Sequence, residues 1–136
     1  MKIDYNKIYA ADCASLLKDP KVFPSNSIDL ILTSPPYADK RGKNYNTITE
    51  KDYVEWFLTI SKELLRVLKK DGVAIININS KSFKKNLVLI PYDFIKQMEQ
   101  IGFIFKDVHY WHKSSGIPRR DNLGDHFEYF LIFFEN

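Results

Sequence analysis

Residues 28–37 read IDLILTSPPY, an apolar run that ends in a hydroxyl, two prolines and a phenol. A short continuous apolar run is typical of a parallel strand that is buried on both faces of its sheet. A proline lacks an N–H, fixes its own φ near about −65°, and pushes the preceding residue toward extended geometry. The stretch therefore predicts a buried strand over 28–33, with a stiff exit that presents oxygen acceptors to a ligand.

Strand and helix patterns alternate around this stretch. A first strand is predicted over 7–11 (KIYAA), followed by a short helical piece near 14–17. The residues at 49–52 (TEKD) resemble a capping box, and apolar residues then recur at steps of three and four, which predicts an amphipathic helix. Gly72 suits the cap of that helix, and 73–78 is predicted as a second buried strand.

The last third of the chain continues the alternation. Pro91 can occupy the first turn of a helix that runs to Ile101 and is closed by Gly102. The segments 103–112 and 127–134 are the last two predicted strands. The order predicts an α/β fold with a mostly parallel sheet, and the final strand–strand step implies an antiparallel strand at one end.

Composition narrows the class of protein. With 136 residues, 45% hydrophobic and 27% charged, the chain is expected to form one globular domain over 1–136. No apolar run approaches the roughly 18 residues of a spanning helix, and the start lacks a signal-peptide core. A single cysteine, Cys13, fits a reducing compartment, so a cytoplasmic protein without membrane contact is expected. The net charge of +3 permits contact with nucleic acid.

Three segments, in order along the chain, carry a resemblance to a known family. They are SPPY at 34–37, ELLRVLKKDGVAIINI at 63–78 and WHKSSGIPRRDNLGDHFEYFLIF at 111–133. They are similar to the catalytic motif, the helix–glycine–strand segment, and the Trp-x-Lys, Pro-Arg and His-Glu strand pair of the DNA amino-methyltransferases. In this chain one residue intervenes in the last element, which reads His-Phe-Glu at 126–128. These enzymes transfer a methyl group from S-adenosylmethionine to an exocyclic amine of cytosine or adenine, and the resemblance implies their Rossmann-like sheet.

The resemblance also implies roles for 34–37. The amine of a base is conjugated with its ring and is a poor nucleophile, so two acceptors are needed to hold its N–H bonds and aim its lone pair. These are the side-chain oxygen of Ser34 and the carbonyl of Pro35, held rigid with the help of Pro36. Tyr37 would stack on a base that has been flipped out of the duplex.

Ser34 at the first motif position favours cytosine N4, because family members with serine there are mostly cytosine-N4 enzymes. Adenine N6 methylation is the alternative reaction. Two readings without this chemistry stay open: the motif as a plain strand exit, and the chain as a silent subunit or remnant that only binds nucleic acid or a partner.

Other residues have two interpretations each. Asp12 matches a position that approaches the adenine amine of the cofactor, but it can equally be an N-cap. Cys13 lacks the Pro-Cys pair of carbon-5 methyltransferases and is expected to be a small, partly buried residue. The predicted loops 38–48 and 113–126 carry basic residues that are either phosphate contacts or solvated side chains: Lys40, Arg41, Lys43, Lys113, Arg119 and Arg120. No metal site is predicted.

The glycine-rich turn that binds the cofactor in this family is missing, since none of the five glycines lies in such a turn. In circularly permuted members the catalytic half comes first, and the target-recognition segment and the cofactor half follow. The chain is therefore expected to be a catalytic half, whose missing strands would lie between 7–11 and 28–33. The strand at 28–33 should then expose an unpaired edge, unless the missing half, a second chain or a second copy covers it.

Overall fold

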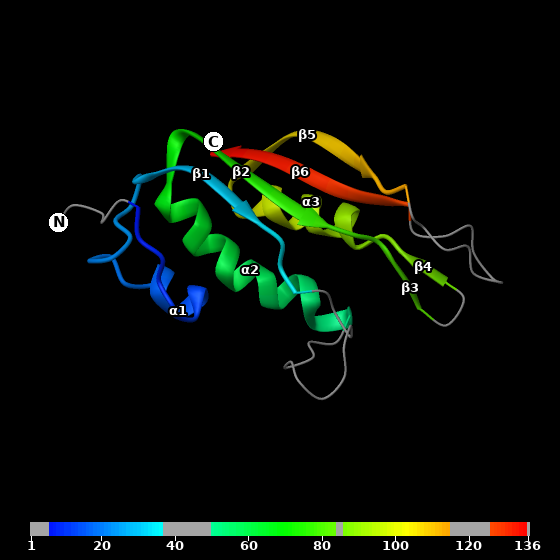
Figure 1. Cartoon of the computed structure of the whole chain (residues 1–136), viewed down its shortest axis with the longest axis horizontal. Helices are drawn as coiled ribbons and strands as arrows, with labels where there is room; N and C mark the ends of the chain where they lie inside the picture. The colour runs from blue at the N-terminus through cyan, green and yellow to red at the C-terminus, as the bar shows by residue number, and fades with distance from the viewer. Residues whose placement is uncertain (1–5, 37–49, 84–85, 115–125, 136) are drawn as a thin grey trace.

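The computed structural model describes residues 6–36, 50–83, 86–114 and 126–135 (Figure 1). The helices of these residues are α1 (Cys13–Leu17), α2 (Glu50–Val67) and α3 (Ile90–Gln100). The strands are β1 (Ile28–Thr33), β2 (Leu68–Ile78), β3 (Lys81–Phe83), β4 (Asn86–Val88), β5 (Phe103–His112) and β6 (Phe127–Glu135). None of the described helices has the length and apolar character needed to cross a membrane.

Four strands form one sheet in the order β1-β2-β6-β5. β1 is parallel to β2, and β6 is antiparallel to both β2 and β5, so that β1, β2 and β5 run in one direction. The predicted α/β fold and the antiparallel last strand are confirmed. The position of that strand was predicted wrongly: β6 lies inside the sheet, because the α3 crossover places β5 one strand beyond β2 and β6 fills the gap. The small β3–β4 hairpin was not predicted.

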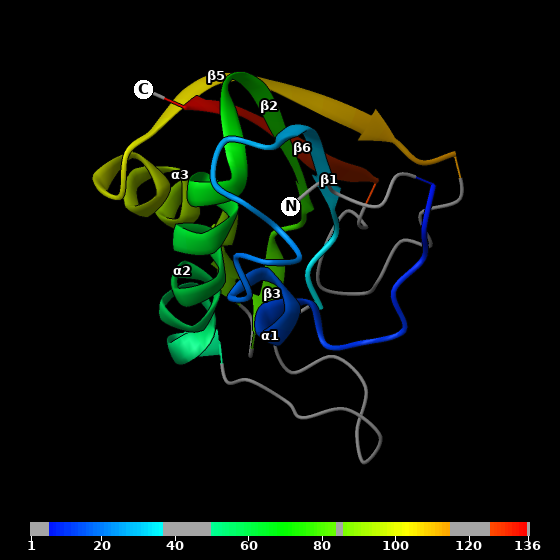
Figure 2. The same ribbon diagram turned by 90° about the vertical axis from the view of Figure 1, so that its left-hand side faces the viewer.

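The helices cover only one face of this sheet (Figure 2). The residues of β2 and β6 that point toward α2 and α3 are fully buried and form the core: Ala74, Ile76, Ile78, Leu131 and Phe133. Phe57 of α2, Phe94 of α3 and Phe133 connect the layers through ring contacts at 5.1 and 6.4 Å. The opposite face of the sheet has no described helix against it.

The predicted strand at 7–11 is wrong. These residues form neither a strand nor a helix, and the side chain of Ile8 is 96% exposed. A strand needs a neighbouring edge for its N–H and C=O groups, and no described strand pairs with this segment. The composition of 7–11 is that of a strand, but the part of the chain that the structure describes contains no strand that pairs with it.

The expected unpaired edge of β1 is confirmed for the described residues. β1 pairs only with β2 and lies at one end of the sheet. Leu30 and Leu32 on this strand are 57% and 65% exposed, so the apolar run that predicted burial on both faces is partly buried on one face only.

The junction between α2 and β2 also differs from the prediction. α2 ends at Val67 and β2 begins at Leu68, so Gly72 lies within β2 instead of capping the helix. The register between β1 and β2 shifts here, because Ile28 pairs with Leu68 whereas Leu30 pairs with Val73. A Cβ atom on Gly72 would lie 2.8 Å from Leu68 Cδ1 and 3.0 Å from the carbonyl oxygen of Ile28. Glycine is therefore required for the close approach of β1.

We predict that Gly72→Ala lowers the free energy of unfolding by about 1–3 kcal/mol, because the new methyl group meets backbone oxygen atoms that cannot move freely. Urea unfolding followed by circular dichroism measures the loss. The matched control is Asp71→Ala at the neighbouring exposed position. Equal stability of the two variants would contradict the packing argument.

Candidate functional site

The exit of β1 lies beside β2 at the carboxyl edge of the sheet. Thr33 pairs with Ile76, which puts Ser34 next to Asn77. Ser34 is exposed, Pro35 is buried and Pro36 is exposed. The serine hydroxyl is thus accessible, while the first proline anchors the exit in the protein.

A hydrogen bond fixes the serine side chain. The Oγ of Ser34 donates to Oδ1 of Asn77 at 3.2 Å, and Nδ2 of Asn77 donates to the backbone oxygen of Tyr129 at 3.4 Å. Asn77 is only 9% exposed, so its amide is held between two strands. Because the hydroxyl hydrogen points to Asn77, the lone pairs of Ser34 Oγ are left to accept a hydrogen bond from a ligand.

The sequence analysis did not identify Asn77. Its signal was present: Asn77 is a polar residue in the otherwise apolar run VAIINI at 73–78. A buried polar side chain needs a hydrogen-bond partner, and the parallel register of β1 and β2 supplies Ser34. That register was not available from the sequence.

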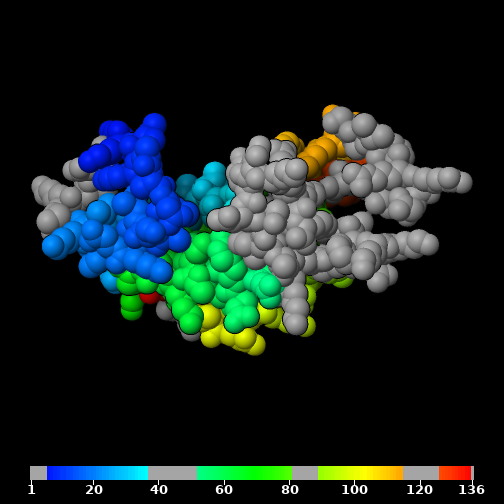
Figure 3. Space-filling model, turned by 90° about the horizontal axis from the view of Figure 1, so that it is seen from below, coloured from blue at the N-terminus to red at the C-terminus, as the bar shows by residue number. Residues whose placement is uncertain are grey.

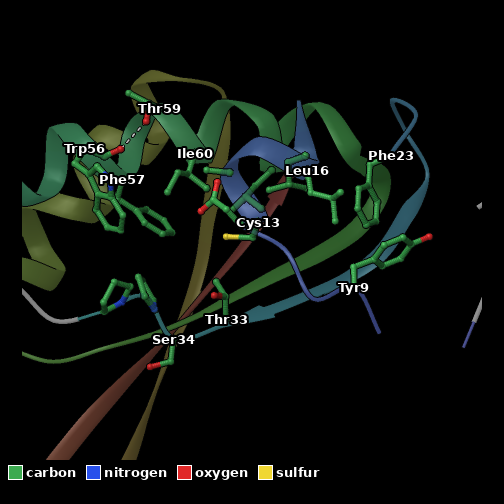
Figure 4. Close-up of a pocket in the computed structure, with 16 residues that line it drawn as sticks. Tyr9, Cys13, Leu16, Phe23, Thr33, Ser34, Trp56, Phe57, Thr59 and Ile60 are labelled. Atoms are coloured by element: carbon green, nitrogen blue, oxygen red, sulfur yellow. Dashed lines mark hydrogen bonds between the residues drawn. The ribbon is translucent and has the colours of Figure 1, made fainter. Parts of the chain in front are cut away.

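A cavity of about 670 Å³ lies between α1, α2 and the exit of β1 (Figure 4). Residues from three distant segments line it, among them Asp12, Cys13, Ser34, Pro35, Trp56 and Phe57. The N-terminal segment, α2 and the exit of β1 also meet on one face of the molecule (Figure 3). The structure therefore brings the predicted cofactor residue Asp12 and the predicted catalytic residues 34–36 to one cavity.

The wall of this cavity formed by α2 is apolar, and the side chain of Ser34 points away from it (Figure 4). Ser34 Oγ is therefore on the rim, on the side of the sheet that carries no described helix. A group held by this hydroxyl approaches along the carboxyl edge of the sheet and not from the depth of the cavity.

Asp12 is the N-cap of α1, and one of its carboxylate oxygens accepts a hydrogen bond from the backbone N–H of Ser15 at 2.8 Å. Hydrogen bonds from Ser15 to the charged form hold the pKa of Asp12 below its ordinary value of 3.8. The N-cap interpretation is confirmed, and the carboxylate also lines the cavity.

Cys13 was expected to be partly buried, and this prediction is wrong. The thiol is exposed and lines the cavity. α1 is only five residues long and none of its side chains is buried, so Cys13 has no core to pack into.

The ends of β5 and β6 bring the Trp-x-Lys and His-x-Glu elements together. Trp111 pairs with Glu128 in the β5–β6 ladder. The backbone N–H of Lys113 donates to the backbone oxygen of His126 at 2.7 Å. The ammonium group of Lys113 forms an ion pair with Glu128 and lies 5.6 Å from the ring centroid of Trp111. A phosphate contact by Lys113 would have to compete with this carboxylate.

The other predicted DNA contacts and the stacking phenol lie outside the described residues: Tyr37, Lys40, Arg41, Lys43, Arg119 and Arg120. Within the ranges that the structure describes, no three His, Cys, Asp or Glu side chains are grouped in a way that could hold a metal ion.

The sheet order, with an antiparallel last strand between two parallel ones, and the proline motif at a strand exit define a methyltransferase-type α/β protein. A family model described as DNA methylase matches residues 28–136, and the chain belongs to this family of amino-methyltransferases.

Individual relatives agree with this assignment. The chain is 32% identical over 114 residues to the type II methyltransferase M.PvuII of Proteus hauseri, a match that covers 82% of the chain and 33% of that protein. It is 35% identical over 105 residues to M.MjaVI of Methanocaldococcus jannaschii, covering 74% of the chain and 53% of the relative. The solved structure of the PvuII DNA methyltransferase (cytosine-N4-specific) superposes with a TM-score of 0.78 at 27% identity, over 94% of the chain and 48% of that structure. The chain thus spans between a third and about half of the length of these relatives.

We predict that an NMR titration will give Asp12 a pKa below 3.8 and that Ser15→Ala will raise it, because the side chain of Ser15 is the largest cause of the shift. A depressed pKa means that the carboxylate stabilises α1 above pH 3.8 and that this contribution is lost as the pH falls through the folded-state pKa. An Asp12 pKa at or above 3.8 in the unmodified chain would contradict the capping geometry.

Proposed function

We propose that this chain is the catalytic half of a DNA methyltransferase that transfers a methyl group from S-adenosylmethionine to the N4 amine of a cytosine flipped out of DNA. The observation that carries the proposal is the oriented hydroxyl of Ser34 at the proline-stiffened exit of β1, hydrogen-bonded to Asn77.

This arrangement suits amine chemistry. With its own hydrogen donated to Asn77, Ser34 Oγ can accept one N–H of the amine, and the Pro35 carbonyl can accept the second. Two fixed acceptors confine the N–H bonds, turn the nitrogen lone pair outward, and stabilise the positive charge that develops on nitrogen during attack. The donor would supply an electrophilic methyl group, and as its carbon bonded to the nitrogen the carbon–sulfur bond would break with its electron pair going to sulfur. Ser34 and Pro35 would hold the two N–H groups as acceptors, and the nitrogen would lose one proton to solvent water.

The described residues fit the methyl donor in part. Asp12 offers a carboxylate that can accept from the adenine amine, and the cavity beside it has a volume in the range of small-molecule sites. The donor supplies an electrophilic methyl group on a sulfonium. No glycine-rich turn is present in the sequence, so we assign the rest of the cradle to polypeptide beyond this chain.

Cytosine N4 is favoured over adenine N6 by the serine at position 34 and by the cytosine-N4 specificity of the PvuII DNA methyltransferase, the relative described above with a TM-score of 0.78. Membership of the DNA methylase family supports DNA as the substrate. The phosphate contacts assigned to Lys40, Arg41, Lys43, Arg119 and Arg120 belong to this proposal, and so does the stacking role of Tyr37.

The direct test is the transfer of a tritiated methyl group to DNA by the chain combined with a cofactor-binding half. We predict that Ser34→Ala lowers the rate constant by about 10²–10³-fold, because one acceptor for the developing charge is lost. The matched control is Ser25→Ala, an exposed serine ahead of the opposite end of β1, which should retain the full rate. Unchanged transfer by Ser34→Ala, or no transfer by the unmodified pair, would contradict the proposal.

We also predict a positioning role for Asn77. Asn77→Leu should lower kcat by about 10- to 100-fold at nearly constant KM for DNA, because the Ser34 hydroxyl loses its orientation. Asn77→Asp keeps an acceptor oxygen toward Ser34 but loses the N–H that Asn77 donates to the Tyr129 carbonyl, so it should recover only part of the rate. If Asn77→Leu folds and transfers at the full rate, Asn77 does not position the hydroxyl.

A further inference from the structure

The guanidinium group of Arg66, in the last turn of α2, binds two backbone oxygens of the N-terminal part of the chain. Its Nη2 donates to the carbonyl of Leu17 at 2.5 Å, and its Nη1 donates to the carbonyl of Phe23 at 3.0 Å. Its Nε donates to the carboxylate of Glu63, one turn earlier in α2, at 2.7 Å, which fixes the plane of the group. Arg66 therefore joins α2 to residues that are 49 and 43 positions away in the sequence.

These contacts suit arginine and no other cation. A guanidinium carries five N–H donors in a rigid planar fork, so a single side chain can bind three acceptors in different directions. A fourth and longer contact, at 3.3 Å to Oγ of Ser25, comes from the nitrogen that already binds Phe23 and is secondary to it. The side chain of Arg66 is 28% exposed, so its hydrogen bonds form partly away from water and are stronger for it.

The backbone at the end of α2 holds the following part of the same segment. The carbonyl of Arg66 accepts the N–H of Asn26 at 3.0 Å, and the carbonyl of Val67 accepts the N–H of Ser27 at 2.8 Å. The last carbonyls of a helix have no partner within the helix and need such donors. The chain between α1 and β1 is therefore wrapped against the last turn of α2, and Arg66 contributes to this with its side chain and its backbone.

α1 has little of its own to keep it in place. It has five residues, none of them buried, and a helix of this length is unstable alone in water. Leu17, its last residue, packs partly against the core, and the carbonyl of this same residue is bound by Arg66. The position of α1 thus depends on the contacts made at its C-terminal end.

The segment that Arg66 anchors forms one wall of the cavity. Asp12, Cys13 and Leu16 line the cavity from α1 and its N-cap, and Phe23 lines it from the loop that follows (Figure 4). Arg66 is not one of the lining residues, so it can act on a molecule in the cavity only through this wall.

We propose that Arg66 is a positioning residue: by binding the backbone at Leu17 and Phe23 it fixes α1 against α2, and so holds the carboxylate of Asp12 at the cavity for the methyl donor. The role of Asp12 toward the donor rests on the proposed function. The anchoring of α1 rests on contacts within the chain and is tested without the donor.

The first test uses the chain alone and follows Asp12 by NMR. Arg66→Met keeps the length of the apolar stem and removes every donor, so α1 should come free and melt. We expect the pKa of Asp12 to rise to its ordinary value of 3.8. The amides of Ser15 and Leu16, which donate to Asp12, should exchange about 10-fold faster or more. The charge of Arg66 is not among the causes of the Asp12 shift, so both changes would come through the helix.

Two further variants serve as controls. Lys62→Met removes a cation from an exposed position on the same helix and should leave the Asp12 pKa and the α1 amides unchanged. Arg66→Lys keeps the positive charge but replaces the fork by one ammonium group, so it should restore only part of the protection of α1. Amide exchange in β2 shows in each variant that the core is folded, and Arg66→Lys decides the question if Arg66→Met unfolds as a whole.

The second test measures methyl transfer by the chain combined with a cofactor-binding half. Arg66→Met should raise KM for S-adenosylmethionine by about 10-fold or more, because the donor loses a hydrogen bond to a charged group. The kcat and the KM for DNA should stay nearly unchanged, whereas a general disturbance of the fold would alter all three.

A low Asp12 pKa with slow exchange at Ser15 and Leu16 in Arg66→Met would overturn the inference. So would an Arg66→Lys variant that matches the unmodified chain in both readouts, or a normal KM for S-adenosylmethionine in a variant whose α1 is released. Failure of the proposed function has a different signature: the unmodified pair transfers no methyl group, while the anchoring of α1 is still read from the chain alone.

Discussion

The parallel pairing of β1 with β2 is the constraint on which the site depends. Its register puts Thr33 opposite Ile76, and the next residue along each strand gives the bond between Ser34 and Asn77. Two strands that are about 40 residues apart in sequence thereby fix the direction of a single hydroxyl hydrogen. Gly72 belongs to the same constraint, because β1 can approach β2 only where no Cβ atom intervenes.

This pairing also explains why the site lies at an edge of the molecule. β1 is the last described strand on its side of the sheet. The residues at its exit therefore have a neighbouring strand, β2, on one side only. On the side of the sheet that carries the helices, Asp12, Trp56 and Phe57 line the cavity next to the site. On the opposite side, the face of the sheet is apolar and exposed. The proposed reaction, in which a flipped base and a methyl donor must enter together, needs access of this kind.

Much of the fold could be predicted from the sequence where local patterns determine it. The amphipathic repeat of α2, the proline at the start of α3 and the apolar runs of β1 and β2 all gave elements close to those observed. The segment 7–11 failed because a strand exists only with a neighbour, and composition alone does not supply one. Asn77 was missed and the place of β6 in the sheet was wrong for a related reason, since both depend on which strands lie side by side.

The proposed function depends on an amine held between Ser34 and Pro35, with Ser34 favouring cytosine over adenine. The most direct measurement is mass spectrometry of the nucleosides from DNA treated with the completed enzyme and S-adenosylmethionine. We predict N4-methyldeoxycytidine as the product. N6-methyldeoxyadenosine as the product, or only unmodified nucleosides, would contradict it.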